Sequence, residues 1–393
     1  MTFKIKMEAE DFQVVEIPQQ VSMQENGKYT VLKLRLKNWE TNHFVIEFSR
    51  YLGISRKRIT YAGTKDKRAV TTQYFCINAE KIPEQIKIKD VEELDRFKTD
   101  KIIDLGDLLG NKFEIRVESQ ESELIKVRDF VTSKSQNLFF WNYFGIQRFG
   151  QLRKNTHLIG EQLVKNGLES AIKTYLFTPG TDNEEYRINL SQSWDFKKGI
   201  KEFPEHLQFE RALMSELISG KSYEDAFDSL PRSLRIMFVH AFQSYIFNEI
   251  LEERKKYVST PIEIIEGDLV SPIDEYYNIT EGKKIEATAF NLQRLNKLSV
   301  EGMVVPLAPL IGTMTDRQEG VPGEIMGKIM DKFKIEKKDF KIQSKPELTS
   351  TGNYRGISIK PIDFKLISMD KYSFSLGKGM YATVLLDQLF GLD

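Results

Sequence analysis

The segment RKRITYAGTKDKRAVTTQYFCINA (residues 56–79) contains two strand-like runs joined by a polar turn, and it sets the expected fold of the N-terminal region. RKRITYAG (56–63) and TTQYFCINA (71–79) are rich in β-branched and aromatic residues, whereas Gly, Thr and Lys are frequent between them. We therefore expect two strands connected by a turn that carries Asp66 between two lysines.

Strand and helix patterns alternate on both sides of this segment. DFQVVEI (11–17), YTVLKLRL (29–36) and FEIRVE (113–118) alternate polar and apolar residues, the period of half-buried strands. TNHFVIEFSRYLG (41–53) has apolar residues at helical spacing, Thr41 as the expected N-cap and a glycine at its end. A helix between strands indicates an α/β or α+β domain.

The pattern becomes mainly helical from about residue 153 to 335. Three segments carry apolar stripes with a period of 3.6 residues: LRKNTHLIGEQLVKNG (152–167), FERALMSELISG (209–220) and PRSLRIMFVHAFQSYIFNEILEERKK (231–256). From about residue 338 strand character returns, in YRGISIKPIDFKLISM (354–369), YSFSL (372–376) and YATVLLDQLF (381–390). This order predicts one sheet domain interrupted by a helical insertion.

Length and charge limit the classes of protein that fit. At about 100–200 residues per domain, 393 residues predict two domains, or one domain with a sizeable insertion. With 40% hydrophobic and 29% charged residues, the composition excludes a disordered or collagen-like chain. The 57 Lys and Arg balance the 57 Asp and Glu, so a site for a polyanion must be a local patch.

Metal, redox and membrane functions find little support in the sequence. The single cysteine, Cys76, cannot form an intramolecular disulfide or a thiolate metal site by itself. His43, His157, His206 and His240 lack H-x-x-x-H spacing, so we expect no catalytic metal. The sequence has neither an apolar signal region at its N-terminus nor a run of about 18 apolar residues. We expect a soluble cytoplasmic protein without membrane contact, and no obligatory protein partner is evident.

The densest basic stretch surrounds the expected turn at Asp66. Phosphate backbones favour such clusters through counterion release, and arginine adds bidentate contacts. A solvated helix end and turn is the alternative, which composition alone favours. The seven cations are Arg50, Arg56, Lys57, Arg58, Lys65, Lys67 and Arg68.

Asp66 itself allows three interpretations. Neighbouring cations favour an ionised carboxylate, which a nucleophile or base needs at neutral pH. The same T-K-D sequence is also typical of an exposed Asx-type turn. A phosphate loop is disfavoured, because GTKDK (63–67) lacks the G-x-x-x-x-G-K-[ST] spacing.

Two aromatic segments could contact RNA or pack in the core. NYFGIQRFG (142–150), preceded by FFW, combines aromatic residues with an arginine, as base stacking and backbone contact require. Core packing is its alternative. HAFQSYIFNE (240–249) is better interpreted as a packed helix whose polar residues tie down a neighbouring loop. These residues are compatible with RNA chemistry without establishing it.

At these residues the sequence closely resembles one family. YAGTKDKRAVTTQ (61–73) resembles the signature that contains the catalytic aspartate of the TruD family of tRNA pseudouridine synthases, and NYFGIQRFG is similar to that family's second signature. Five weaker matches lie in family order along nearly the whole chain: KMEAEDFQVVE (6–16), GNKFEIRV (110–117), QSYIFN (243–248), EGDLV (266–270) and FSLGKGMYATVLL (374–386).

This resemblance implies an α+β fold with a mixed or antiparallel sheet. Residues 1–152 and 338–393 would form the pseudouridine synthase catalytic domain, and residues 153–337 the inserted, largely helical TruD domain. RNA would bind in the cleft between them. The implied reaction converts a uridine, at position 13 of tRNA, to pseudouridine without a cofactor. The implied partner is tRNA, with other structured RNA as the alternative.

The resemblance also implies roles for individual residues. Asp66 matches the catalytic aspartate, acting either as a nucleophile or by removing a sugar proton. Lys6 is expected near that carboxylate, Phe144 to stack on the extruded uracil, and Asn142 to hydrogen-bond within the site. Gly63 and Gly145 are expected in tight turns. The residues expected to bind RNA or brace the site are Arg56, Lys57, Arg58, Lys65, Lys67, Arg68, Gln147 and Arg148.

The sequence departs from the family pattern at two places outside the catalytic signature, and two competing hypotheses for the function are kept beside the resemblance. Asp387 and Gln388 stand where the family often has an Arg-Glu pair, and PLIG (309–312) replaces an L-P-G element. A non-catalytic RNA-binding or RNA-chaperone protein could use the same residues. A nucleotide-binding enzyme built on GTKDK (63–67) is the other hypothesis.

Overall fold

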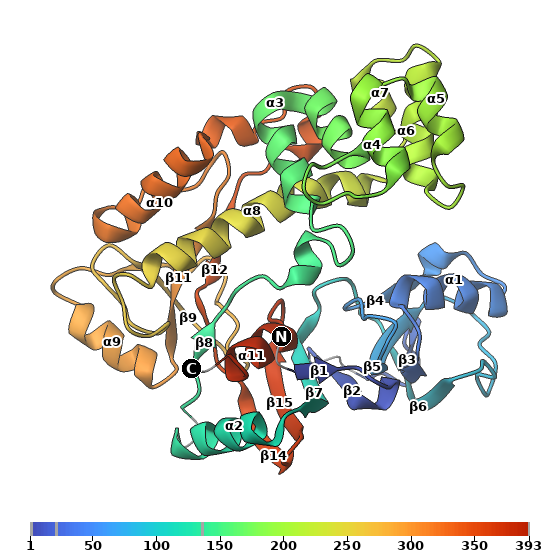
Figure 1. The fold of residues 1–393 in the computed structure, drawn as a ribbon. Coiled ribbons are helices and arrows are strands. Elements are labelled where there is room, and N and C mark those ends of the chain that lie inside the picture. Colours follow the sequence, from blue (N-terminus) through green and yellow to red (C-terminus); the bar gives the residue numbers. More distant parts are fainter. Residues whose placement is uncertain (1–2, 20–22, 135–136, 392–393) are drawn as a thin grey trace. The chain divides into compact units, whose positions relative to one another are not determined.

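The computed structural model describes residues 3–19, 23–134 and 137–391, and the chain divides into two compact units (Figure 1). Both units mix helices and strands, so the predicted α+β class is confirmed. The predicted domain boundaries at 152/153 and 337/338 stay predictions. Unit 1 comprises Met1–Phe140, Ile273–Thr280 and Ile359–Asp393, and unit 2 comprises Trp141–Pro272 and Glu281–Ser358.

Among the described residues, nine strands form the sheet of unit 1, in the order β14-β15-β7-β2-β5-β3-β6, with β1 paired to β7 and β4 to β5. β2 and β5 run parallel, whereas the other neighbours along this order are antiparallel. The predicted strands at 11–17, 29–36 and 113–118 are confirmed as parts of this sheet. The strands are β1 (Phe3–Ile5), β2 (Phe12–Pro18), β3 (Tyr29–Lys37), β4 (Ile59–Tyr61), β5 (Val70–Ile77), β6 (Val91–Thr99), β7 (Leu108–Ser119), β14 (Ile362–Ser368) and β15 (Lys371–Gly377).

The helices α1 (Thr41–Tyr51), α2 (Glu121–Ser133) and α11 (Ala382–Leu389) pack on the apolar side chains of this sheet. Phe44 and Phe48 of α1 contact buried leucines of β3, while α2 and α11 cover β2, β7 and β15. On the opposite face, Val31 of β3 and Cys76 of β5 belong to a smaller buried cluster, and Lys33 and Arg35 of β3 are less buried.

Two local predictions in unit 1 are wrong. YATVLLDQLF (381–390) forms helix α11 and not a strand, because burying Ala382, Leu385 and Leu389 together requires helical spacing. The N-cap of α1 is Glu40, whose carboxylate accepts bonds from the first-turn N–H groups. Thr41 is therefore available for a different contact, described below.

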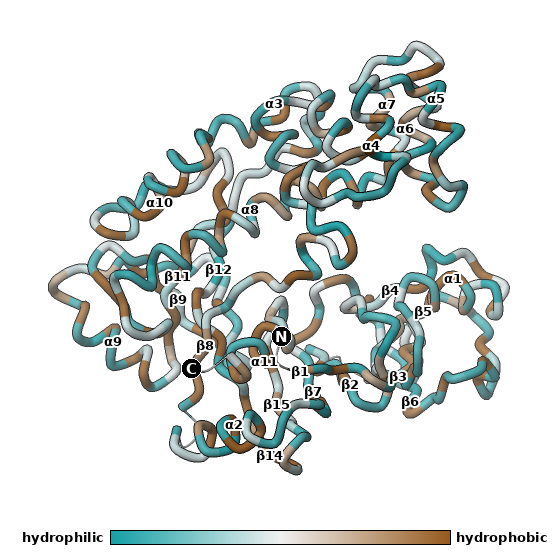
Figure 2. Tube along the Cα trace, in the orientation of Figure 1, coloured by the Kyte–Doolittle hydropathy of each residue, from teal (hydrophilic) through white to brown (hydrophobic). Residues whose placement is uncertain are grey.

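Unit 2 has a core between long helices, in which α3 packs along α8. Figure 2 shows hydrophobic and hydrophilic segments alternating along these helices, as expected when one side of each is buried. The helices are α3 (Thr156–Leu176), α4 (Glu185–Ser193), α5 (Phe196–Glu202), α6 (Gln208–Ile218), α7 (Tyr223–Phe227), α8 (Arg232–Arg254), α9 (Leu292–Val300) and α10 (Gly320–Phe333).

The sequence pattern missed a small sheet in unit 2, with the strand order β10-β9-β11-β12. Its central strand, VVPLAPL, is buried along almost its whole length and so lacks the alternation that identifies a half-buried strand. The strands are β9 (Leu269–Pro272), β10 (Ile285–Glu286), β11 (Val304–Leu310) and β12 (Asn353–Gly356); β8 (Phe140–Trp141) and β13 (Ser358–Ile359) pair separately.

Candidate functional site

The turn that carries Asp66 connects β4 to β5 and is held by buried polar side chains. Thr41 Oγ1, at the start of α1, accepts a 2.7 Å hydrogen bond from the Lys65 N–H. Gln73 Nε2, from β5, donates to the Gly63 carbonyl at 2.9 Å and to Thr41 Oγ1 at 3.1 Å. Because buried polar groups are costly to leave unpaired, these bonds fix the backbone that leads into Asp66.

The Lys65 side chain points into this network. Its Nζ lies 2.6 Å from Glu16 Oε1, and the two side chains are only 9% and 1% exposed. The other Glu16 oxygen accepts the Tyr74 N–H at 3.1 Å. The Lys65 ammonium group is therefore buried against a carboxylate and braces the turn, while a role of Lys65 in RNA binding stays a prediction.

Gly63 leaves room for this ion pair. A Cβ at Gly63 would lie 3.1 Å from Lys65 Nζ and 3.2 Å from Glu16 Oε1, closer than most real contacts. The φ angle of Gly63 lies outside the left-handed region, so the predicted tight turn does not itself require a glycine here. The reason for a glycine is instead the close approach of the Lys65 and Glu16 side chains to its backbone.

Asp66 differs from its neighbour, since its side chain is 55% exposed. Lys6 Nζ lies 3.0 Å from Asp66 Oδ2, so the predicted proximity of these two residues is present. The Lys6 side chain is 14% exposed, and its ammonium group also lies 4.2 Å from the centroid of the Phe12 ring. The ring and the carboxylate together hold the ammonium group, which in turn orients an accessible carboxylate.

The backbone of Lys6 adopts an unusual conformation, with φ at 60° in the left-handed region. A non-glycine residue there costs on the order of 1–3 kcal/mol. Lys6 directly follows β1 and precedes the 3₁₀ turn Ala9–Asp11. The conformation thus turns the chain at the residue whose side chain meets Asp66, and such strain is often found at functional sites.

Three of the basic residues, Arg56, Lys57 and Arg58, lie far from Asp66 along the sheet. Arg56–Arg58 precede β4, and the Arg58 carbonyl accepts the Asn78 N–H just beyond the end of β5. The turn with Asp66 leads into Val70, at the other end of β5, and eight residues at about 3.3 Å each separate these ends by more than 20 Å.

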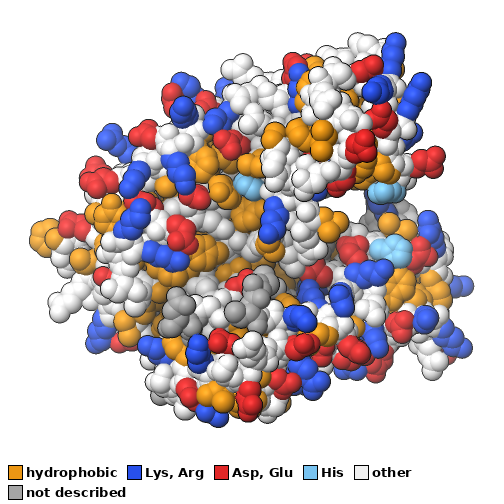
Figure 3. Space-filling model, in the orientation of Figure 1, with side chains coloured by type: hydrophobic (Ala, Val, Ile, Leu, Met, Phe, Trp, Pro, Cys, Tyr) orange, Lys and Arg blue, Asp and Glu red, His pale blue; other side chains and the backbone are white. Residues whose placement is uncertain are grey.

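The remaining cations of the stretch differ in their contacts. Arg50 pairs with Glu47, and Arg68 Nη2 donates to the Met7 carbonyl at 2.9 Å, while Lys67 is exposed. In the face shown in Figure 3, basic and acidic side chains are interspersed. The cations of the 50–68 stretch therefore lie in separate small groups with different contacts.

The second signature lies in unit 2, where Asn142 follows β8. Its side chain is buried, and Nδ2 donates to the Gly356 carbonyl at 2.8 Å while Oδ1 accepts from Arg355 Nη2 at 2.6 Å. The Asn142 N–H donates to the Ile357 carbonyl at 2.9 Å. Asn142 therefore ties its segment to β12 and the residue after it.

Phe144 is half-buried and is held by α8. Its N–H donates to Asn248 Oδ1 at 2.8 Å, and Asn248 Nδ2 donates to its carbonyl at 3.0 Å. The Phe144 and Phe247 rings meet edge to face, with centroids 5.5 Å apart. The interpretation of HAFQSYIFNE (240–249) as a helix that ties down a neighbouring loop is confirmed.

Arg148 is also anchored to α8. Its Nε donates to Ser244 Oγ at 3.1 Å, and its guanidinium carbon lies 5.7 Å from the Phe144 centroid. Burial, and secondarily the charge of Arg148, lower the pKa of His240. Gln147 is half-buried in the 3₁₀ turn Ile146–Phe149.

The glycine that this segment requires is Gly150, whose φ is 102° and whose Cβ would lie 2.1 Å from the Arg153 carbonyl oxygen. Gly145, which we expected to need a tight turn, has a φ of −73°, a value that any residue adopts. The position of NYFGIQRFG that requires a glycine is therefore its last residue, Gly150.

Sequence reasoning missed several residues of these two segments. Glu16 and Gln73 are the last residues of the matched motifs at 6–16 and 61–73, so these motifs could have identified both as candidate site residues. Arg355 lies in a stretch identified only as a strand, and no motif indicated its contact with Asn142.

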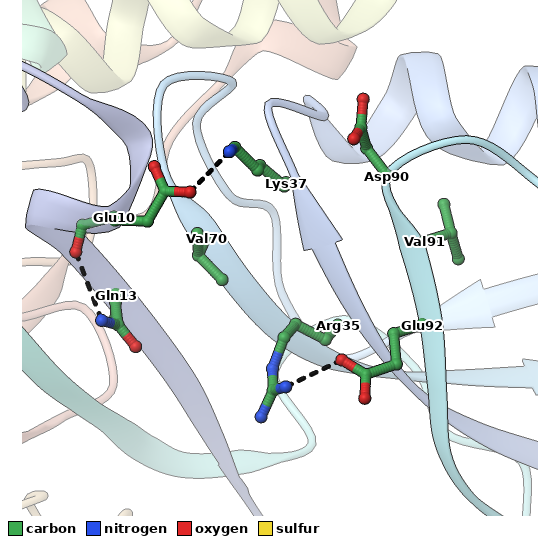
Figure 4. Close-up of a pocket in the computed structure, with 8 residues that line it drawn as sticks. All are labelled: Glu10, Gln13, Arg35, Lys37, Val70, Asp90, Val91 and Glu92. Carbon is green, nitrogen blue, oxygen red and sulfur yellow. Dashed lines mark hydrogen bonds and ion pairs between the residues drawn. The ribbon is translucent and has the colours of Figure 1, made fainter.

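A separate pocket of about 560 Å³ lies on the other face of the unit 1 sheet (Figure 4). Two ion pairs line it: Glu10–Lys37 at 2.5 Å and Arg35–Glu92 at 2.7 Å. The hydrogen bond from Lys37 lowers the pKa of Glu10. Phe12 contacts Lys6, and the next residue of the strand, Gln13, lines the pocket. Consecutive strand residues point to opposite faces of a sheet, so the pocket and Lys6 lie on opposite faces. The pocket is therefore distinct from the Lys6–Asp66 pair.

Over the described ranges, no helix combines the length and the apolar character that a membrane crossing requires. In the same ranges, no three or more His, Cys, Asp and Glu side chains gather as ligands for a metal ion. The expectation that no cofactor is needed stays a prediction.

Comparisons with known proteins agree with the two signatures. The sequence model of the family tRNA pseudouridine synthase D (TruD) matches residues 1–389. The probable tRNA pseudouridine synthase D of Picrophilus torridus is 45% identical over 392 residues, covering 98% of this chain and 93% of that protein. Its counterpart in Thermoplasma volcanium is 40% identical, covering 98% and 94%.

A solved structure supports the same comparison. The crystal structure of the putative tRNA pseudouridine synthase D from Methanosarcina mazei superimposes with a TM-score of 0.81. The two sequences are 34% identical, and the match covers 99% of this chain and 94% of the other.

Proposed function

Because the chain belongs to the TruD family of tRNA pseudouridine synthases, we propose that it isomerises a uridine of tRNA to pseudouridine with Asp66 as the catalytic carboxylate. Position 13 is the target that the family implies. The observation that carries this proposal is the 3.0 Å contact between Lys6 and Asp66, which orients an exposed carboxylate on a fixed turn. A binding module has no need of that arrangement.

The reaction breaks the N1–C1′ bond, rotates the uracil and forms a C5–C1′ bond, while C5 loses a proton and N1 gains one. No atom or electron is added, so the reaction needs neither an oxidant nor a second substrate. The Asp66 carboxylate would act as a nucleophile, or as a base that removes a sugar proton. Its exposure gives a nucleotide access for either role.

We also propose that Phe144 stacks on the extruded uracil. Extrusion costs a few kcal/mol of lost stacking, and an aromatic side chain compensates about 1–3 kcal/mol of it. Support comes from the two hydrogen bonds with Asn248, which fix the Phe144 backbone while the ring stays half-exposed. Asn142 would act by fixing this segment, since its amide bonds Gly356 and Arg355. Binding of RNA between the two domains stays a prediction from the family.

Substitution of Asp66 tests the proposal. Asp66→Asn should lower the rate of pseudouridine formation by about 10³-fold or more, while tRNA binding stays within about tenfold. Pseudouridine is mapped by carbodiimide-dependent primer-extension stops on unmodified tRNA, with a cytidine-13 transcript as the substrate control. Asp95→Asn, an exposed carboxylate of β6, is the matched protein control.

Three outcomes would contradict parts of the proposal. Turnover by Asp66→Asn would exclude Asp66 as the catalyst. Stops at a position other than 13 would replace the implied target. Binding of tRNA by the unaltered chain with no stop above background would favour the non-catalytic RNA-binding hypothesis.

A further inference from the structure

Arg355, in β12, contacts both residues of the second signature that we connect with the uridine. Its Nη2 donates to Asn142 Oδ1 at 2.6 Å, and its Nε donates to the Asn142 carbonyl at 3.4 Å. The same guanidinium group lies over the Phe144 ring, 4.2 Å from the centroid. One side chain therefore joins the amide and the aromatic ring.

Only an arginine can make these contacts together. A guanidinium group is planar, carries five donors in a fixed fork and stacks on aromatic faces, whereas a lysine ammonium is a point charge. The group is half-buried, and desolvation strengthens both a charged hydrogen bond and a cation–π contact.

The base of this side chain is also fixed. Arg355 pairs with Ala308 of β11, and the next residue, Gly356, accepts the Asn142 amide. Asn142 is thus held by two consecutive residues of one strand. A change at Arg355 would release the Asn142 oxygen and the Phe144 ring at once.

We propose that Arg355 is a positioning residue that fixes the plane of the Phe144 ring and the amide of Asn142 before the uridine enters. This inference rests on the proposed function for its effect on rate. A displacement of about 1 Å at a reacting group can cost about 10²-fold in rate, so ring placement alone gives a measurable effect.

Kinetics of Arg355→Met and Arg355→Lys on unmodified tRNA test the inference. We expect both variants to lower the single-turnover rate by about 10–10²-fold, with the KM for tRNA within about threefold. Lysine should not rescue, because it lacks the fork and the plane. Arg294→Met, on the exposed side of α9, is the matched control and should behave as the unaltered chain.

A direct contact with an RNA phosphate would give a different result. Lysine would then restore activity, and the methionine variant would raise KM with an unchanged single-turnover rate. That outcome would overturn the positioning role.

A spectroscopic measurement separates this inference from the proposed function. In the full chain without RNA, 4-fluorophenylalanine at position 144 reports the surroundings of the ring by ¹⁹F NMR. We expect Arg355→Met and Asn142→Ala to shift the resonance, and Arg294→Met to leave it unchanged. An unshifted resonance in folded Arg355→Lys and Arg355→Met would overturn the inference, even if pseudouridine is made. If these substitutions shift the resonance but the unaltered chain forms no pseudouridine, the contact between Arg355 and Phe144 is supported and the proposed function is refuted.

Discussion

Lys65 and Asp66 are consecutive residues of one turn, but their ion pairs lie in opposite environments. Lys65 pairs with Glu16 in the interior, whereas Asp66 pairs with Lys6 and keeps half of its side chain exposed. Breaking a buried pair leaves an unpaired charge that costs about 3–5 kcal/mol, whereas an exposed pair contributes about 0–1 kcal/mol. The buried pair therefore holds the turn, and the exposed pair presents the carboxylate for chemistry.

The largest effect on stability should come from Lys65→Met. The Glu16 carboxylate would then stay buried without its cation, and the free energy of unfolding should fall by about 3–5 kcal/mol. Urea unfolding followed by circular dichroism measures this change. Lys67→Met, at an exposed neighbour, should stay within about 0.5 kcal/mol of the unaltered chain. Equal unfolding curves for the two variants would refute the supporting role of the buried pair.

Lys6→Met should show the opposite behaviour. Without the ammonium group the Asp66 carboxylate loses its orientation, so the single-turnover rate should fall by about 10–10²-fold. The unfolding free energy should change by less than about 1 kcal/mol. Primer-extension stops and urea unfolding on the same preparation check both. A stability loss as large as that of Lys65→Met would erase the distinction between the two pairs.

A smaller effect should separate Lys6→Gly from Lys6→Ala. Glycine adopts a φ of 60° without the steric cost of a Cβ, so Lys6→Gly should be more stable by about 1 kcal/mol. Both variants lack the ammonium group and should be equally slow. Greater stability of the alanine variant would show that the left-handed conformation is not costly at this position.

The smallest effect concerns the coupling between Lys6 and Asp66 themselves. A double-mutant cycle on the free energy of unfolding should give a coupling energy below about 1 kcal/mol between these two side chains. This coupling energy should fall as the salt concentration rises. The same cycle on Glu16 and Lys65 should give a larger coupling that salt changes little, because that pair is buried. Equal coupling and equal salt dependence would contradict the comparison.

Strands with a clear period were predicted correctly, whereas β11 was missed and α11 was predicted as a strand. β2, β3 and β7 have one buried and one polar face, so alternation identified them. β11 is buried along most of its length, and the short apolar run of α11 fits either period. For such segments, packing against the rest of the fold decides between helix and strand, and the local sequence pattern does not indicate which one forms.

The sequence also predicted part of the site, namely those contacts whose two residues both lie in family motifs. Its motifs named Lys6 and Asp66 as neighbours, and the structure brings their side chains together. The sequence could not tell which lysine of the turn is buried, because Glu16 lies 49 positions away. The contact of Arg355 with Asn142 spans 213 positions and has no motif of its own.

The parallel pairing of β2 with β5 has a consequence for how the protein folds. Parallel neighbours need a long crossover connection, and here that connection contains β3 and α1. Lys6 precedes β2 and Asp66 precedes β5, so their contact joins two segments that this non-local pair brings together, and non-local pairing is slow in folding. A nascent chain that has made only its local hairpins would lack the pair, and isomerase activity would then serve as a reporter of the completed sheet.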